Sequence, residues 1–327
     1  MTRFASPRTQ TIVVLLFIVF LAWWSMKFYM DNSNDSETDA YAQALVDHAL
    51  VASISSDPTG HATILAQYVL SPFALAFERV TGLYLIRGFV AARFVVDLAL
   101  FAAAYVWYRR TGLGWFNALL GLVLLSISMA FALLIRGWEL DKVLEPMLFL
   151  LAAVAAWNKR YVSLVVLAAL AALNRETGVL MGLVALAAVA DTRGRGLVDA
   201  ARQWPVWLCL CVTLAIVVPV RVLGPQLVLS PAAALTANLN FPRIAYIVGG
   251  LCLLPIFAFA WLDSAPAALR RLFWLLVPAW LVLVLATAQL DQGSELLGVV
   301  ALVFVPFSLL GASNLLQRQR VIALPHD

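Results

Sequence analysis

Long apolar runs recur along almost the whole chain, and they constrain its fold more than any motif does. Hydrophobic residues make up 63% of the chain and charged residues 12%, whereas a soluble domain has about 25% charged residues. A membrane-spanning helix needs about 20 apolar residues. The sequence therefore predicts an all-α, polytopic transmembrane bundle of about ten membrane helices. The runs lie at 11–30, 83–108, 115–135, 143–157, 161–173, 178–190, 204–222, 244–262, 272–288 and 298–316.

The positions of Lys and Arg predict which helix ends face the cytoplasm. With ten crossings, thirteen of the twenty-two basic residues fall on one side, as the positive-inside rule requires of cytoplasmic loops. We therefore expect a bacterial cytoplasmic-membrane protein with both termini in the cytoplasm and an uncleaved first span. The net charge of +4 then reflects topology and not nucleic-acid binding. The thirteen are Arg3, Arg8, Arg109, Arg110, Lys159, Arg160, Arg193, Arg195, Arg202, Arg270, Arg271, Arg318 and Arg320.

The largest outer segment, 31–82, is where a catalytic surface is expected. It opens with a cluster of acids, Asp31, Asp35, Glu37 and Asp39. A carboxylate there can act as general base by taking a proton from an attacking hydroxyl. Apolar residues at helical spacing predict an amphipathic helix over 38–53 on the outer surface.

Asp39 differs from its neighbours because it begins that amphipathic helix, which fixes its position. A purely structural role, capping the first helical N–H groups, is the competing interpretation. Tyr41 follows it closely, and His61 is a candidate proton shuttle further along the same outer segment.

Charged residues inside apolar runs are candidates for a functional role, because burying a charge in hydrocarbon is costly. Arg87, Arg93 and Asp97 lie in the outer half of the second run. Arg93 and Asp97 are four residues apart and can pair along one helix face, which would also make them a self-neutralised structural pair. For Arg87, a side chain that reaches the headgroups is the simple alternative.

The turn at 174–177 separates two short apolar runs and carries Arg175 and Glu176. We expect this turn below the outer surface, with backbone N–H groups of Thr177 and Gly178 free to bind phosphate and Arg175 adding a bidentate contact. The alternative is an Arg–Glu pair that only stabilises the turn. A second outer loop carries Arg136 and Lys142, and Glu145-Pro146 is expected to open the next helix.

These features together resemble the GT-C class of integral-membrane glycosyltransferases. The resemblance rests on residues 39–44 after the first span, on 67–72, on the Arg-bearing second span and on the 174–177 turn, and it covers roughly 1–190. It is strongest to the bacterial branch that uses polyprenyl-phosphate-linked sugars. The chain departs from that pattern at Gln67-Tyr68, where relatives often carry Arg. The last four runs, within 191–327, match only in being apolar.

The resemblance implies an inverting sugar transfer from a polyprenyl-phosphate donor to an acceptor hydroxyl of a glycan or glycolipid, on the periplasmic face. It implies Asp39 as base, with Asp35 and Asp31 behind it, and a single transmembrane domain whose catalytic half is 1–190. Some members of the class hold a divalent metal, Mg or Mn, on outer-loop acids and others use none, so the metal stays open. The implied phosphate-binding residues are Arg175, Arg87, Arg136 and Arg93, supported by Glu176, Tyr41, His61 and Lys142.

Three other functions fit a many-spanned chain. A transporter or flippase should carry charges along a path through the midplane and an internal repeat, and neither is found in the sequence. An O-antigen polymerase or ligase should have its main outer loop late in the chain, whereas here it comes first. An accessory membrane subunit without activity is the third alternative.

Overall fold

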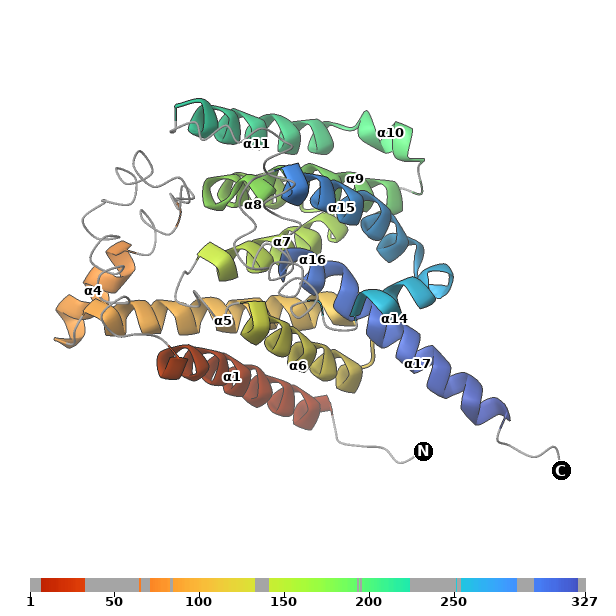
Figure 1. The fold of residues 1–327 in the computed structure, drawn as a ribbon, viewed down its shortest axis with the longest axis horizontal. Coiled ribbons are helices and arrows are strands. Elements are labelled where there is room, and N and C mark those ends of the chain that lie inside the picture. Colours follow the sequence, from red (N-terminus) through yellow and green to blue (C-terminus); the bar gives the residue numbers. More distant parts are fainter. Residues whose placement is uncertain are drawn as a thin grey trace.

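The computed structural model confirms that the chain is helical. It describes residues 7–32, 65, 71–82, 85–132, 141–192, 194, 196–223, 251, 254–286 and 297–322, among which there is no strand. Helices cover the described part of each of the ten apolar runs (Figure 1). The predicted amphipathic helix at 38–53 lies outside these residues.

The first half of the chain forms helices α1 to α9. The two short runs predicted on either side of the 174–177 turn are separate helices, as expected. The helices are α1 Pro7–Asn32, α4 Ser71–Thr81, α5 Leu85–Arg110, α6 Trp115–Ala132, α7 Asp141–Trp157, α8 Tyr161–Asn174, the 3₁₀ helix η2 Glu176–Leu180 and α9 Met181–Thr192.

The second half adds α10 to α17. The last apolar run forms one continuous helical stretch that changes to a π-helix over five residues. The elements are α10 Leu197–Ala201, α11 Trp204–Leu223, α14 Leu254–Ala260, η3 Leu262–Ser264, α15 Ala267–Ala286, α16 Leu297–Val299, the π-helix η5 Val300–Phe304 and α17 Val305–Ile322.

Polar contacts join several helices at one end of the bundle, which we call the Asp191 end. The indole N–H of Trp157, at the end of α7, donates to Asp191 at the end of α9 over 3.0 Å. Arg271 of α15 donates to the same carboxylate over 3.0 Å. Arg110, at the end of α5, donates to the carbonyl of Trp157 over 2.9 Å. The ends of α5, α7 and α9 and the start of α15 therefore lie together.

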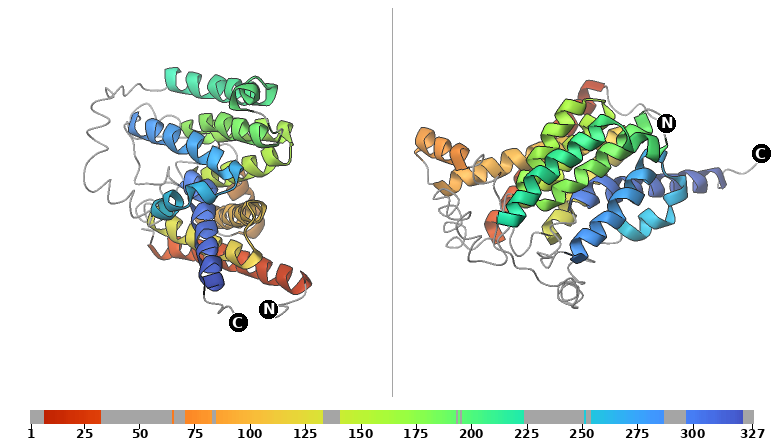
Figure 2. Two further views of the ribbon diagram at one scale, coloured as in Figure 1. Left: turned by 90° about the vertical axis from the view of Figure 1, so that its right-hand side faces the viewer. Right: turned by 90° about the horizontal axis from the view of Figure 1, so that it is seen from above.

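The start of α1 and the far end of α17 point to this same side of the molecule (Figures 1 and 2). An aromatic contact between Tyr161 and Trp204, with ring centroids 5.9 Å apart, places the start of α11 beside the start of α8. Residues that the positive-inside rule assigned to one side thus meet at one end of the bundle.

α5 and α7 pack side by side at the centre, and α8, α9, α16 and η5 pack around α7. One side-chain bond joins the π-helix to α5. Pro306 has no N–H, so it cannot make the helical hydrogen bond to the carbonyl of Leu302. That carbonyl accepts instead from the indole N–H of Trp107 on α5, at 3.0 Å. A bond between distant helices thus satisfies the backbone group that the proline leaves unpaired.

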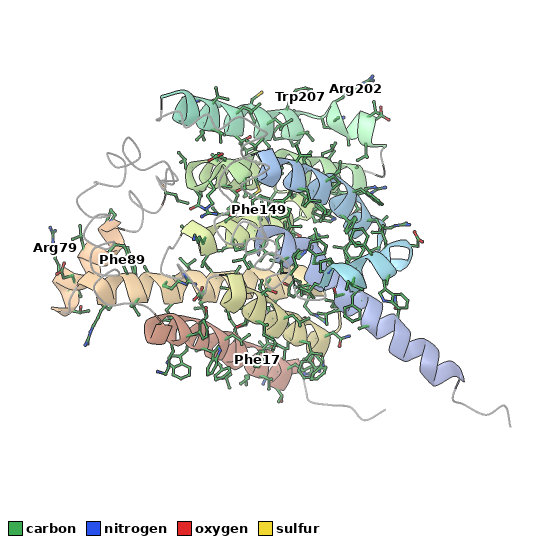
Figure 3. The ribbon with its side chains drawn as sticks, in the orientation of Figure 1. Phe17, Arg79, Phe89, Phe149, Arg202 and Trp207 are labelled. Carbon is green, nitrogen blue, oxygen red and sulfur yellow. The ribbon has the colours of Figure 1, made fainter. Side chains whose placement is uncertain are left out.

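Three helices in the described residues are long and apolar enough to cross a bilayer: Pro7–Phe28, Arg87–Arg110 and Leu297–Asn314. Shorter apolar helices lie at Trp115–Ala130, Tyr161–Asn174 and Trp204–Pro219. Apolar side chains also cover the outside of the bundle. Trp207 of α11 is 57% exposed, whereas Phe149 of α7 is buried in the middle (Figure 3). Apolar side chains on the exterior as well as in the interior are compatible with a membrane protein.

Candidate functional site

Within the described residues, the buried charged side chains are Arg93, Asp97, Lys142, Glu145 and Arg175. They occupy one level of the bundle. On α5, a certain number of residues separates Asp97 from Arg110 at the helix end. On α7, nearly the same number separates Glu145 from Trp157. At about 1.5 Å per helical residue, this interval places both acids about 20 Å from the Asp191 end.

The end of α8 reaches the same level, since α8 starts near the Asp191 end at Tyr161 and runs for 14 residues to Asn174. Ser128 of α6 is also buried there, and its hydroxyl has no hydrogen-bond partner among the described residues. We call this set of buried polar residues the polar layer. It contrasts with the apolar core on either side.

Arg93 and Asp97 are paired within the polar layer, as their spacing predicts. The Nε atom of Arg93 lies 3.1 Å from each carboxylate oxygen of Asp97. Ser25 of α1 also hydrogen-bonds this carboxylate. The pair therefore neutralises itself and ties α1 to α5, which favours the structural interpretation of these two residues.

Arg175 makes an ion pair across helices. Its Nη1 atom lies 3.6 Å from Oε2 of Glu145 on α7, and both side chains are 3% exposed. At that separation the contact is an ion pair and not a hydrogen bond. Asn174 and Thr177 are buried beside Arg175 in the chain, and Lys142 is buried one turn before Glu145. We call these five residues the Arg175 cluster.

The backbone explains how the turn holds Arg175 inside the bundle. α8 ends at Asn174, Arg175 is extended, and the chain then closes into the 3₁₀ helix η2. Gly178 makes this possible, because a Cβ atom there would lie 2.5 Å from the carbonyl carbon of Ala171 and 2.7 Å from its oxygen. Only glycine allows η2 to fold so closely over the end of α8.

One expectation about this turn is wrong. The N–H of Gly178 is not free for phosphate, since it donates to the carbonyl of Arg175 over 3.0 Å. The short 3₁₀ helix uses this donor internally, as its i→i+3 pattern requires. Anion binding at the turn therefore cannot use the N–H of Gly178.

The predicted start of the next helix also needs correction. α7 begins at Asp141, so Pro146 lies inside the helix and not at its opening. Lys142 and Glu145 then belong to its first two turns and not to an outer loop. Since Pro146 has no N–H, it cannot bond the carbonyl of Lys142. The turn that carries both charged residues is held to the rest of α7 by one hydrogen bond fewer than usual.

The other predicted site residues are distributed as follows. Arg87 is exposed near the start of α5, away from the Arg175 cluster along the helix. Glu176 is partly buried at the start of η2. The backbone of Asp31 lies in the last turn of α1. Asp35, Asp39, Tyr41, His61 and Arg136 lie outside the described residues.

No group of three or more His, Cys, Asp or Glu side chains within the described residues lies close enough to hold a metal ion. The outer-loop acids Asp35 and Asp39, on which a metal would depend, lie outside those residues.

Sequence reasoning did not single out Glu145. The sequence suggested only that Glu145 opens a helix, because the residue lies next to a proline. Lys142 is its only local partner on the same helix face. Its partner Arg175 lies beyond the end of the next helix and meets it only through the packing of α8 on α7. The sequence did offer one signal for Glu145, namely an acidic residue expected at the same membrane depth as the 174–177 turn.

Comparison with protein-family models, with curated proteins and with solved structures gives no match for this chain. Its function must therefore be argued from the bundle and the polar layer.

Proposed function

We propose that the chain is an integral-membrane glycosyltransferase of the GT-C class that uses a polyprenyl-phosphate-linked sugar on the outer face of the bacterial cytoplasmic membrane. In this reaction a carboxylate of the outer loop, Asp39 first, takes the proton of the acceptor hydroxyl. The hydroxyl oxygen bonds to the anomeric carbon, the bond from that carbon to the phosphate oxygen breaks, and polyprenyl phosphate leaves.

The observation that carries this proposal is the position and charge of the Arg175 cluster. With the Asp191 end at the cytoplasmic boundary, as the positive-inside rule predicts, the polar layer lies about 20 Å into a hydrocarbon core about 30 Å thick. A lipid phosphate that dips below the headgroups reaches such a level while its chain stays in hydrocarbon. Arg175 and Lys142 supply the positive charge for it.

The buried charges also weigh against a transporter. A transport path requires polar groups at successive depths through the membrane midplane. In the described residues the buried charges share one level, and the helices between that level and the Asp191 end bury apolar side chains such as Leu100, Ala104, Phe149 and Ala168. A site reached from one side fits an enzyme of the outer face better.

Incubation of the purified protein with a panel of polyprenyl-phosphate sugars and glycan acceptors tests the proposal. We expect one donor to yield a glycosylated product with inverted anomeric configuration together with free polyprenyl phosphate. If the panel includes the donors and acceptors present in the native membrane and no sugar moves, the glycosyltransferase proposal is wrong.

A further inference from the structure

The turn between α7 and α8 places a lysine where glycine would fit without strain. The N–H of Arg160 donates to the carbonyl of Ala155 over 2.9 Å, and the N–H of Lys159 donates to that of Ala156 over 3.0 Å. These two bonds form a Schellman motif, in which the residue after the helix is left-handed and is usually glycine. Lys159 occupies that position, with a φ of 60°. Strain of this kind is found where a side chain has a function, for example in holding a ligand.

Arg110, at the end of α5, holds this turn in place. Its guanidinium donates to the carbonyl of Trp157 and to the side-chain oxygen of Asn158. The side chains of Lys159 and Arg160 are exposed beside these bonds. The positive-inside rule requires basic residues in such a turn, but it requires neither a left-handed lysine nor an arginine that braces the backbone. We call Arg110, Lys159 and Arg160 the basic corner.

The acids described at the Asp191 end are engaged elsewhere or lie on other elements. Asp191 accepts hydrogen bonds from Trp157 and Arg271. Asp199 belongs to α10 and Asp263 to η3. Within the described residues, no acid pairs with the side chain of Lys159 or Arg160. These two cations can therefore meet an anion from outside the chain.

An apolar strip leads from the basic corner along α7 into the membrane. α7 lies between α5 and α8 (Figure 1). Within 142–157 it is exposed in part only at Met147, Leu151 and Val154, whose spacing places them on one helix face. Val162 in the first turn of α8, next to the basic corner, is 74% exposed. Cations at the end of an exposed apolar surface match a molecule with an anionic head and hydrocarbon chains.

We propose that the basic corner binds an anionic phospholipid of the cytoplasmic leaflet. Lys159 and Arg160 contact its phosphate, and its acyl chains lie along the strip on α7. Arg110 is a positioning residue, because its bonds fix the turn. The cytoplasmic leaflet carries negative surface charge, and basic groups between membrane helices on that side bind anionic headgroups. This inference does not rest on the proposed sugar transfer, which takes place on the opposite face.

Two lipids with the same chains test the site. Palmitoyl-oleoyl phosphatidylglycerol is anionic, and palmitoyl-oleoyl phosphatidylcholine has no net charge. Binding of each to the purified full chain in detergent is measured by native mass spectrometry. The unmodified protein should bind phosphatidylglycerol more tightly. Lys159→Gly and Arg160→Gln should each weaken that binding by about fivefold and leave phosphatidylcholine binding unchanged.

The choice of variants separates the side chain from the turn that carries it. Glycine adopts a positive φ without strain, so Lys159→Gly should melt in lipid-free detergent no lower than the unmodified protein does. Its weaker binding then cannot be due to loss of the fold. Arg270→Gln is the matched control, because it removes an exposed positive charge at the same end of the bundle, on α15. It should keep the affinity for phosphatidylglycerol.

Three results would overturn the inference. The site is wrong if the unmodified protein binds both lipids equally, or if Lys159→Gly and Arg160→Gln bind phosphatidylglycerol as tightly as the unmodified protein does. Equal losses in Arg270→Gln would show a general attraction to the charged end and no defined site. Glycerol phosphate has the anionic group without the chains, so equally tight binding of glycerol phosphate would make this an anion site and not a lipid site.

Discussion

Glu145 and Arg175 form a buried ion pair that joins the first turns of α7 to the turn after α8, with 3.6 Å between Oε2 and Nη1. The pair lies at the level where α5 carries Arg93 and Asp97. Two acid–base pairs on neighbouring helices therefore form one polar layer. They differ in that Arg93 and Asp97 lie on one helix, whereas the Glu145–Arg175 pair joins α7 to the turn after α8.

Asp39→Asn should abolish glycosyl transfer without changing expression or the melting temperature. An amide cannot accept the proton of the acceptor hydroxyl, and loss of a general base lowers the rate by about 10²- to 10⁴-fold. Transfer is measured with the donor identified in the panel. Asp35→Asn is the matched control, because it removes one acid of the same cluster. Full activity of the Asp39 variant together with loss in the Asp35 variant would move the assignment of the base to Asp35.

Gly178→Ala should destabilise the fold and weaken binding of the donor. The added Cβ atom would lie 2.5 Å from the carbonyl carbon of Ala171, so η2 must move away from α8 and take Arg175 with it. Overpacking of this kind costs about 1–3 kcal/mol. Gly196→Ala is the control, since nothing lies within 4 Å of a Cβ atom there and its φ is −62°. Equal melting temperatures for the two variants would contradict the close approach of η2 to α8.

Trp107→Phe should lower the melting temperature, because the Leu302 carbonyl loses the indole donor that replaces the missing N–H of Pro306. Leaving a buried carbonyl unpaired costs about 1–3 kcal/mol. Trp207→Phe makes the same chemical change on the exposed face of α11 and should have little effect. The role assigned to the Trp107–Leu302 bond is wrong if both variants melt at the same temperature as the unmodified protein.

A cysteine placed at Ser36 should react with a thiol reagent that cannot cross the membrane, added from the periplasmic side. The three native cysteines are replaced first. A cysteine at Lys159, in the turn between α7 and α8, should react only after the membrane is permeabilised. The predicted topology fails if the two sites show the reverse pattern of labelling.

The helices and one ion pair of the site could be predicted from the sequence, because both depend on local spacing. Apolar runs alone indicate where the helices lie, and an i,i+4 spacing is enough to pair Arg93 with Asp97. The grouping of Arg110, Trp157, Asp191 and Arg271 at one end also follows from the pattern of charge along the chain.

Contacts that depend on packing could not be predicted in this way. Glu145 meets Arg175 only because α8 folds back along α7, and Trp107 meets the Leu302 carbonyl across 195 positions of sequence. The N–H of Gly178 was expected to be free because the turn was predicted to lead directly into a helix. The 3₁₀ turn that Gly178 permits instead uses this donor internally.

The central claim is that Arg175 holds the phosphate of a lipid-linked donor, and binding of a polyprenyl phosphate to Arg175→Ala tests it most directly. Hydrogen bonds to a charged group contribute about 1.5–3 kcal/mol, so affinity should fall by about tenfold to a hundredfold. Arg271→Ala, the same change at the Asp191 end, should bind as the unmodified protein does. Unchanged affinity in a folded Arg175→Ala protein would contradict the claim.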